Sequence, residues 1–332
     1  MRVLVIGGGG YVGSLLVQKL VEKKINVLVL DLFIYGEPQY VFSGFNDSKY
    51  LRTIKGDLRD IDLITNLIYE SDSVIHLACI SNDPSFELNP DLGKSINFDS
   101  FFPLIKACKK KIDKFIYASS SSVYGIKNEQ NVTEELSLEP LTDYSKYKAM
   151  CEDILLNESG NNFCSTILRP ATVCGYTNRT RLDVIVNILT NHAYNKRKIT
   201  INGGKQKRPN IHVNDMVNAY IEILNQPNEK VKNEIFNVGF ENYTLDQIGE
   251  LVKKKIGDDI VINHEVTNDN RSYHISSSKI INLLGFKPQF SIEIGINDLK
   301  EAFEKKLLIN SFNDPKYFNI KTMQKIKLKW IL

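Results

Sequence analysis

Hydrophobic residues in the first half of the chain fall into short runs, and longer segments with the apolar spacing of helices separate these runs. The runs are typical of buried strands at 2–6, 26–30, 51–55, 73–77, 114–118 and 163–168. Segments 11–23, 61–70, roughly 92–110 and 143–159 are predicted to be helical. Strands that alternate with helices indicate βαβ units. The pattern therefore predicts an α/β fold with a parallel sheet covered on both faces.

The pattern changes after Pro170. Short strands predicted at 198–201 and 260–263 alternate with helices of varied length, and 235–238 has the composition of a strand that returns to the main sheet. We therefore expect two non-contiguous domains. Residues 1–170 with about 213–240 would carry the parallel sheet, and 171–212 with 241–332 would form a smaller α+β domain. The lysine-rich tail at 321–329 is interpreted as a solvated helix face.

Composition narrows the classes of function. The 332 residues carry a net charge of +3 with lysines spread along the chain, which argues against a nucleic-acid partner. Five cysteines without a Cys-x-x-Cys pair favour a reducing compartment over a disulfide framework, and no spacing suggests a metal site. No apolar run is long enough to span a membrane, and no signal peptide precedes the first strand. We expect a cytoplasmic protein.

A glycine-rich turn joins the first predicted strand to the first predicted helix. Gly7 permits the tight turn, Gly10 lets backbone approach a phosphate and Gly13 lets the helix pack on the strand. The helix N-terminus adds N–H groups and partial positive charge for a pyrophosphate. Asp31 ends the next strand about 20 residues later, where a carboxylate binds the adenosine ribose and repels a 2′-phosphate. The segment predicts a Rossmann-type, doubly wound sheet that binds NAD rather than NADP.

Tyr144 and Lys148 stand four residues apart in a predicted helix, a spacing that puts both side chains on one face. An ammonium beside a phenol stabilises the phenolate, so we expect the pKa of Tyr144 to fall from about 10 toward working pH. Such a tyrosine can remove the proton of a sugar or alcohol hydroxyl while a nicotinamide takes the hydride.

Seven short motifs follow one another in a fixed order along the chain. They are Gly7-x-x-Gly10-x-x-Gly13, Gly56-Asp57-Leu58-Arg59-Asp60, His76-Leu77-Ala78, Ser119-Ser120-Ser121-Ser122-Val123-Tyr124-Gly125, Tyr144-x-x-x-Lys148, Leu168-Arg169-Pro170 and Arg208-Pro209-Asn210-Ile211-His212-Val213. With this set the chain resembles the extended short-chain dehydrogenase/reductase family over nearly its full length, in particular the nucleotide-sugar epimerases and dehydratases.

The resemblance implies roles for individual residues. Ser120 would hydrogen-bond the reacting hydroxyl, Tyr144 would be the base, and Lys148 would hold the ribose hydroxyls of NAD. The residues implied at the cofactor are Gly7, Gly10, Tyr11, Val12, Gly13, Asp31, Leu32, Asp57, Leu58, Leu77, Ala78, Cys79, Asn97, Tyr144, Lys148 and Ala171. The candidates at a nucleotide-diphosphate sugar are Ser81, Asn82, Ser121, Thr172, Arg179, Arg181, Arg208 and Arg271. Arg208 matches an arginine that contacts the substrate diphosphate in the family.

The serine run also distinguishes between reactions. The 4,6-dehydratases of the family carry an acid pair directly before their Val-Tyr-Gly or Leu-Tyr-Gly motif, and these positions hold Ser121 and Ser122 here. Neither is a carboxylate, so we expect epimerisation or oxidation rather than dehydration. Either serine is also an alternative to Ser120 as the residue that meets the reacting hydroxyl.

The resemblance implies an NAD-dependent enzyme that acts at C4 of a nucleotide-activated sugar through a 4-keto intermediate, in bacterial surface-polysaccharide biosynthesis by analogy with the family. Two alternatives stay open: a 4-dehydrogenase that releases the 4-keto hexose or heptose, and a non-catalytic NAD-sensing binding protein. The helices at 92–110 and 143–159 carry apolar residues on more than one face. We expect a homodimer through these helices, which form a four-helix bundle between subunits in the family.

Overall fold

The computed structural model describes residues 1–129, 131–160, 163–267 and 274–326. A parallel seven-stranded sheet forms its centre, in the order β10-β6-β5-β4-β1-β2-β3. The strands are β1 (Arg2–Ile6), β2 (Asn26–Asp31), β3 (Leu51–Lys55), β4 (Ser73–His76), β5 (Lys114–Ala118), β6 (Cys164–Pro170) and β10 (Glu234–Val238). The strand predicted at 235–238 is confirmed: it returns to the main sheet and pairs with β6.

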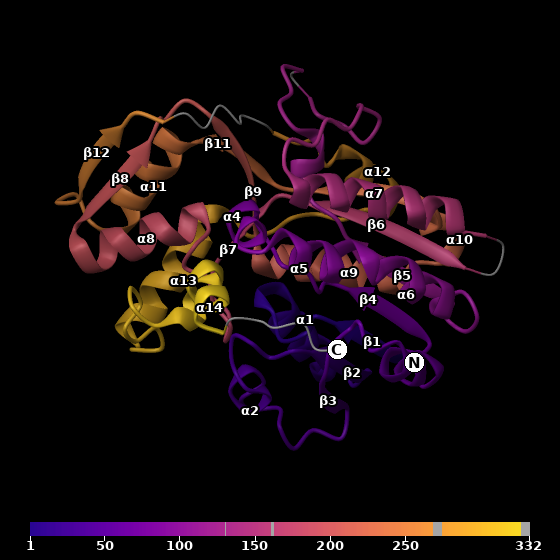
Figure 1. Cartoon of the computed structure of the whole chain (residues 1–332). Coiled ribbons are helices and arrows are strands. Elements are labelled where there is room, and N and C mark those ends of the chain that lie inside the picture. The colour runs from indigo at the N-terminus through magenta and orange to yellow at the C-terminus, as the bar shows by residue number, and fades with distance from the viewer. Residues whose placement is uncertain (130, 161–162, 268–273, 327–332) are drawn as a thin grey trace.

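Helices cover both faces of this sheet (Figure 1). On one face lie α1 (Tyr11–Glu22) and α9 (Val213–Asn225), whose buried residues share a hydrophobic cluster with Val3. On the other lie α3 (Ile61–Tyr69), α6 (Phe101–Cys108) and α7 (Asp143–Glu158), which share a second cluster with Leu4. Successive strand residues point to opposite faces, so each strand contributes side chains to both clusters. The predicted doubly wound α/β fold is confirmed, with the Rossmann strand order around β1 and β4.

The remaining strands form two small sheets beside the main one, at the left of Figure 1. The first contains β11 (Glu241–Thr244), β9 (Lys207–His212) and β7 (Thr172–Cys174), and the second pairs β12 (Val261–Glu265) with β8 (Lys198–Asn202). Their helices are α8 (Ile185–Lys196), α11 (Leu245–Ile256) and α13 (Ile292–Glu304), which pack on a hydrophobic cluster of their own. The domain boundaries expected near 170, 213 and 240 stay a prediction.

The segment predicted to be helical at about 92–110 is helical, but it is not one regular α-helix. The segment consists of α5 (Pro90–Lys94), a π-helical turn η1 (Ser95–Asp99) and α6. The wide turn carries the buried Asn97, whose Oδ1 accepts a hydrogen bond from the Ile80 N–H at 2.8 Å and whose Nδ2 donates to the Ile80 carbonyl at 3.0 Å. Apolar periodicity continues on both sides of such a turn, so the pattern of the sequence does not reveal it.

The other helical segments are short. They are α2 (Pro38–Val41), α4 (Asp83–Glu87), η2 (Ser121–Tyr124), α10 (Asn228–Val231), α12 (Ser278–Leu284), η3 (Pro315–Tyr317) and the C-terminal α14 (Asn319–Ile326). Among the described residues, no helix is both long and apolar enough to cross a membrane. Nor does any group of three His, Cys, Asp or Glu side chains in these residues have the arrangement of a metal site.

Candidate active site

A cavity of about 860 Å³ extends along the carboxyl ends of the central strands and into the part of the chain that forms the two small sheets and their helices. Its size lies toward the upper end of the roughly 300–1,000 Å³ of ligand pockets, which leaves room for a large ligand. The cofactor candidates that line it are Gly7, Gly10, Tyr11, Val12, Gly13, Asp31, Leu32, Leu58, Leu77, Ala78, Cys79, Tyr144, Lys148 and Ala171. The substrate candidates that line it are Ser81, Asn82, Ser121, Thr172, Arg179, Arg181 and Arg208, together with Ser120. Arg271 lies outside the described residues.

The glycine turn connects β1 to α1 at the middle of the cavity. Gly7 has a φ of +87°, and a Cβ atom at this position would lie 2.4 Å from the Ala78 backbone nitrogen. A Cβ atom at Gly13 would lie 2.4 Å from the Gly7 carbonyl oxygen. Both positions therefore require glycine to bring the end of β1, the start of α1 and the segment after β4 into close contact.

Asp31 at the end of β2 faces the same turn. Its Oδ2 accepts a hydrogen bond from the Gly9 N–H at 2.9 Å, and its Oδ1 accepts one from the Phe33 N–H at 2.7 Å. Burial raises the pKa of Asp31, while these two backbone hydrogen bonds oppose the rise. The carboxylate is thus held in one orientation beside the glycine turn.

Tyr144 and Lys148 lie in the first turns of α7. Thr142 caps this helix: its Oγ1 accepts a hydrogen bond from the Ser145 N–H at 3.3 Å, and its own N–H donates to the Ser145 Oγ at 3.1 Å. The helix places Tyr144 in the cavity, where it hydrogen-bonds Ser120. Ser120, Ser121 and Ser122 all line the cavity; Ser120 acts to lower the pKa of Tyr144, and its choice as the reacting serine stays a prediction.

The predicted effect of Lys148 on Tyr144 is not found. The Lys148 Nζ donates to the Ala118 carbonyl at 2.6 Å and lies 6.0 Å from the centre of the Tyr144 ring. Burial raises the pKa of Tyr144 well above its ordinary value, and Cys79 and Asp83 add to the rise. The Ser120 hydrogen bond and the nearby Arg181 act in the opposite direction. The spacing of the two residues was read correctly, but it does not tell how deeply the phenol is buried.

A buried polar network behind Ser120 was missed by the sequence analysis. The Ser119 hydroxyl donates to Glu152, and Arg169 at the end of β6 forms a bidentate ion pair with the same carboxylate, with its NH2 at 2.6 Å from Oε2. Tyr144, Lys148 and Glu152 recur at four-residue spacing on one face of α7. That spacing was the available signal, and the network fixes the ends of β5 and β6 beside the serine turn.

Two residues expected at the cofactor do not line the cavity. Asp57 forms an ion pair with Arg59, whose NH2 lies 2.6 Å from Oδ2. Burial acts to raise the pKa of Asp57, but the hydrogen bonds from Arg59 outweigh it and the pKa is lowered. Asn97 makes two hydrogen bonds to the Ile80 backbone and so holds the segment after β4 in place.

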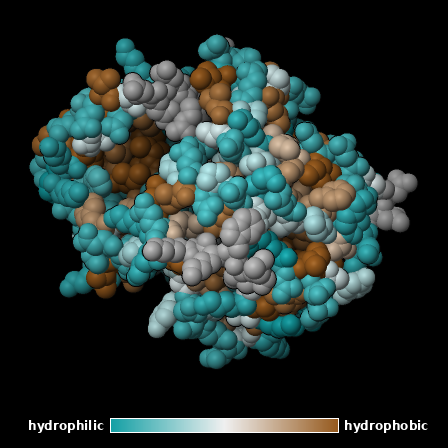
Figure 2. All heavy atoms as spheres, viewed as in Figure 1, coloured by the Kyte–Doolittle hydropathy of each residue, from teal (hydrophilic) through white to brown (hydrophobic). Residues whose placement is uncertain are grey.

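The half of the cavity beside the two small sheets is lined by apolar side chains. Figure 2 shows the surface hollowed on this side, with hydrophobic residues deep in the hollow. The apolar lining residues from this part of the chain include Ile185, Ile188, Leu189, Ile201 and Leu245. Arg208 of β9 and Thr172 of β7 line the cavity from the neighbouring small sheet. An apolar slot next to a guanidinium has the chemistry to hold a flat base and its phosphates.

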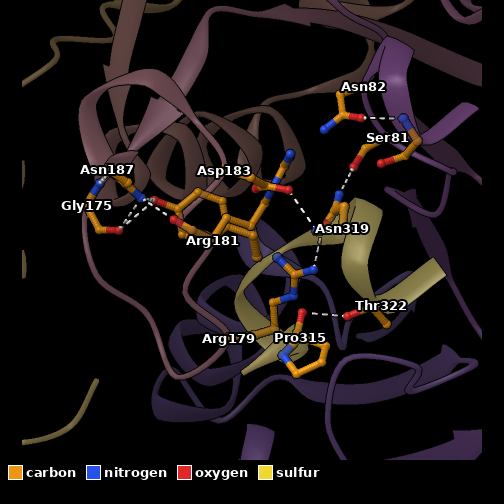
Figure 3. A network of polar contacts seen from close by, with 12 residues as sticks. Ser81, Asn82, Gly175, Arg179, Arg181, Asp183, Asn187, Pro315, Asn319 and Thr322 are labelled. Atoms are coloured by element: carbon orange, nitrogen blue, oxygen red, sulfur yellow. Dashed lines mark hydrogen bonds and ion pairs between the residues drawn. The ribbon is translucent and has the colours of Figure 1, made fainter. Parts of the chain in front are cut away.

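A hydrogen-bonded cluster joins the C-terminal helix to the cavity (Figure 3). Asn319, the first residue of α14, is 1% exposed. Its Oδ1 accepts from the Arg179 NH2 at 2.5 Å, its Nδ2 donates to the Ser81 Oγ at 2.7 Å, and its N–H donates to the Asp183 Oδ2 at 2.7 Å. Asp183 also accepts from the Arg181 Nε at 2.8 Å. Asn319 lies more than a hundred residues from each partner in the chain, so no local pattern could have found it.

A glycine turn at the switch point of a parallel sheet, a carboxylate after the next strand and a Tyr/Lys pair all face one cavity, which is the arrangement of a dinucleotide-binding site. Comparison with known proteins narrows the class. The chain belongs to the NAD dependent epimerase/dehydratase family, which matches residues 3–239.

Relatives within the family differ in reaction. A UDP-glucose 4-epimerase of Lactobacillus helveticus is 30% identical over 311 residues, which cover 87% of this chain and 92% of the relative. UDP-glucuronic acid decarboxylase 1 of Arabidopsis thaliana is 25% identical, over 93% of this chain and 71% of the relative. The crystal structure of UDP-glucuronic acid 4-epimerase from Bacillus cereus, in complex with UDP-glucuronic acid and NAD, matches with a TM-score of 0.82 and 26% identity, over 92% of this chain and 100% of that one.

Proposed function

We propose that this chain is an NAD-dependent 4-epimerase of a nucleotide-activated sugar. One observation carries the proposal: Ser120, Tyr144 and Lys148 face the cavity that also contains the glycine turn. A base, a serine hydroxyl beside it and a dinucleotide site would thus share one cavity. The 4-epimerases among the relatives support this reaction over the decarboxylation named for others.

The lining residues fit NAD. The turn at Gly7, Gly10 and Gly13 offers backbone N–H groups at the start of α1, and Asp31 is held by two backbone amides where ribose hydroxyls would be bound. When bound, NAD supplies a hydride acceptor at C4 of the sugar and a hydride donor for the reverse step.

The chain supplies the proton chemistry. Tyr144 takes the proton of the C4 hydroxyl as the 4-keto sugar forms, and it returns a proton to the C4 oxygen when the other epimer is made. Ser120 hydrogen-bonds Tyr144 and aligns the hydroxyl with it. Lys148 holds a positive charge at the inner end of the cavity, where it is tied to the Ala118 carbonyl.

The nucleotide would occupy the second half of the cavity. The apolar lining at Ile201 and Leu245 suits a base, and Arg208 suits the diphosphate through bidentate hydrogen bonds. The sugar then lies between Tyr144 and the loop of Ser81 and Asn82. A role in bacterial surface-polysaccharide biosynthesis is part of the proposal on family analogy alone.

The test is to incubate the protein and NAD with UDP-glucose, UDP-N-acetylglucosamine and UDP-glucuronic acid in turn. Products are analysed by NMR, and NADH is followed by its absorbance. A C4 epimer without net NADH supports the proposal. A released 4-keto sugar with stoichiometric NADH would identify a 4-dehydrogenase instead, and binding of NAD and sugar nucleotide without either product would identify a sensing protein.

A further inference from the structure

Arg179 is a buried cation without a carboxylate partner among the described residues. It is 4% exposed and lines the cavity, and its guanidinium stacks on the Tyr35 ring at 3.8 Å. The NH2 group donates to Asn319, but Nε and NH1 are buried and have no hydrogen-bond partner in the described part of the chain. Burial, with Arg181 nearby, lowers the pKa of Arg179 to about 10. A buried guanidinium with two free donors is costly unless an anion meets it.

The position of Arg179 identifies the anion. Tyr35 follows β2 and Ser81 follows β4, and these two strands flank β1, which leads into the glycine turn. Arg179 contacts the first loop through Tyr35 and the second through Asn319. It also acts electrostatically on Asp31 and on Tyr11, the first residue of α1. Arg179 therefore lies over the turn at which the pyrophosphate of a bound dinucleotide sits.

We propose that Arg179 binds the pyrophosphate of the dinucleotide cofactor, and that Asn319 of the C-terminal helix holds the guanidinium in place for it. The inference rests on the proposed use of NAD by this chain. It moves Arg179 from the substrate, where the sequence analysis expected it, to the cofactor. Arg181 differs from Arg179 because Asp183 already neutralises it at 2.8 Å.

The role of Asn319 follows from its three hydrogen bonds. With Oδ1 on Arg179, Nδ2 on Ser81 and its N–H on Asp183, its amide side chain has one orientation. Behind it, Met323 of α14 packs into the hydrophobic cluster of the main sheet. The C-terminal helix thus reaches across to the cofactor half of the cavity and fixes an arginine there.

The test compares ligands that share parts of NAD. Calorimetry is done on the full chain, stripped of bound nucleotide, with NAD, ADP-ribose, adenosine and UDP as ligands. We expect Arg179→Met to weaken NAD and ADP-ribose binding by about 10–100-fold, the range for hydrogen bonds to charged groups. Adenosine, which lacks the pyrophosphate, and UDP, which probes the substrate side, should bind within about twofold of wild type.

Further variants separate positioning from folding. Arg179→Lys keeps the charge but not the planar fork, and should give an intermediate loss. Asn319→Ala should weaken ADP-ribose binding less than Arg179→Met does, whereas Gln324→Ala, at an exposed position of the same helix, should leave it unchanged. Arg208→Met should have the opposite effect: it should weaken UDP binding and leave ADP-ribose binding unchanged.

Three results would overturn the inference. In the first, Arg179→Met binds ADP-ribose as tightly as wild type. In the second, it loses UDP or adenosine affinity as strongly as ADP-ribose affinity, which marks a substrate contact or a structural role. In the third, the wild type binds neither NAD nor ADP-ribose, which also removes the proposed function.

Discussion

Asp31 shows how a single residue selects between two cofactors. Both carboxylate oxygens accept backbone hydrogen bonds at 2.9 and 2.7 Å, so the side chain cannot swing away from an incoming 2′-phosphate. Repulsion between the two anions should make NAD bind more tightly than NADP. We expect Asp31→Ala to narrow the difference between the two dissociation constants measured by calorimetry. Equal or tighter binding of NADP by the wild type would contradict this reading of Asp31.

Tyr144 is the residue on which proton transfer depends. We expect Tyr144→Phe to keep the fold and most of the NAD affinity while turnover falls by about 10²–10⁴-fold, the span of a general acid–base group. Tyr147→Phe, one helical turn later and stacked on Phe98 at 5.2 Å, is the matched control and should keep turnover. Because burial raises the pKa of Tyr144, the wild-type rate should also increase with pH through the neutral and alkaline range. A Tyr144→Phe enzyme with wild-type turnover would remove the residue from the mechanism.

The serine turn decides which reaction can follow oxidation at C4. Dehydration needs a base at C5 and an acid at the C6 hydroxyl, and Ser121 and Ser122 cannot titrate in the required range. Asp83 lines the cavity near Tyr144, where its Oδ1 accepts from the Thr142 Oγ1 at 2.5 Å. Two further carboxylates line the cavity, but Asp31 is held at the glycine turn and Asp183 is paired with Arg181.

We therefore expect no 4,6-dehydratase activity on any nucleotide sugar that the protein binds. The measurement is mass spectrometry of the products after incubation in deuterated water. A deuterated 4-keto-6-deoxy sugar, one water lighter than its substrate, would show that other carboxylates supply the acid and the base. Asp83→Asn would then reveal whether Asp83 is one of them.

At the scale of single residues, local motifs predicted several side chains that line the cavity, while their roles stay predictions. Gly7, Asp31, Ser120 and Tyr144 could be placed at this cavity because each belongs to a short pattern at one strand end or in one helix. The contact between Arg179 and Asn319 depends on two segments that the fold brings together across 140 positions. No spacing within either segment signals it.

At the scale of elements, β4 ends at a buried histidine, and its burial should make the free energy of unfolding depend on pH. His76 is 3% exposed and lies among the rings of Phe101, Phe115 and Tyr117, with centroids 5.8, 6.2 and 5.8 Å away. Burial, and then the charge of Lys148, lowers the pKa of His76 from 6.5 to about 3. The unfolded chain therefore binds a proton between these values that the folded chain does not.

The sign of the effect follows from this difference. The contribution of His76 to stability is complete above pH 6.5 and is lost as pH falls toward 3, by up to about 1.4 kcal/mol per pH unit. We expect His76→Phe to reduce this slope in urea unfolding measured between pH 7 and pH 5. His264→Gln, at a histidine with 55% side-chain exposure, is the control and should keep the wild-type slope. An unchanged slope in His76→Phe would contradict the assignment.

Element types followed from periodicity, whereas their interruptions did not. The strands of the main sheet were predicted to within two residues at each end because buried parallel strands are continuous apolar runs. Apolar spacing predicted that roughly 92–110 is helical, and it is. The π-helical turn at Ser95–Asp99 forms where Asn97 hydrogen-bonds Ile80, a contact between elements that periodicity does not encode.

At the scale of the whole molecule, two neighbouring helical segments carry an apolar stripe that is partly exposed. It consists of Phe98 and Phe102 on η1 and α6, and Tyr147, Met150 and Ile154 on α7. Phe102 is 45% exposed and Met150 is 43% exposed. The spacing of four residues on the first segment, and of three and four on the second, places the stripe residues of each segment on one side of it; Phe98, Tyr147 and Ile154 lie at its inner edge against the core. Lys106 lies over the Phe102 ring at 4.9 Å and also pairs with Glu158 at 3.2 Å, which places charge at the rim of the stripe.

This stripe is the surface through which we expect a homodimer. A two-fold axis between the helices would set each stripe against its copy, because a closed dimer buries the same patch on both subunits. Sedimentation equilibrium at micromolar concentration should give twice the mass of the chain. Phe102→Glu combined with Met150→Glu should give the monomer mass, since it puts four charges into the centre of the interface. Val266→Glu changes a side chain that is 98% exposed on another part of the molecule and should leave the dimer intact. A monomeric wild type would contradict the dimer itself, and a dimeric double variant would place the interface on a different surface.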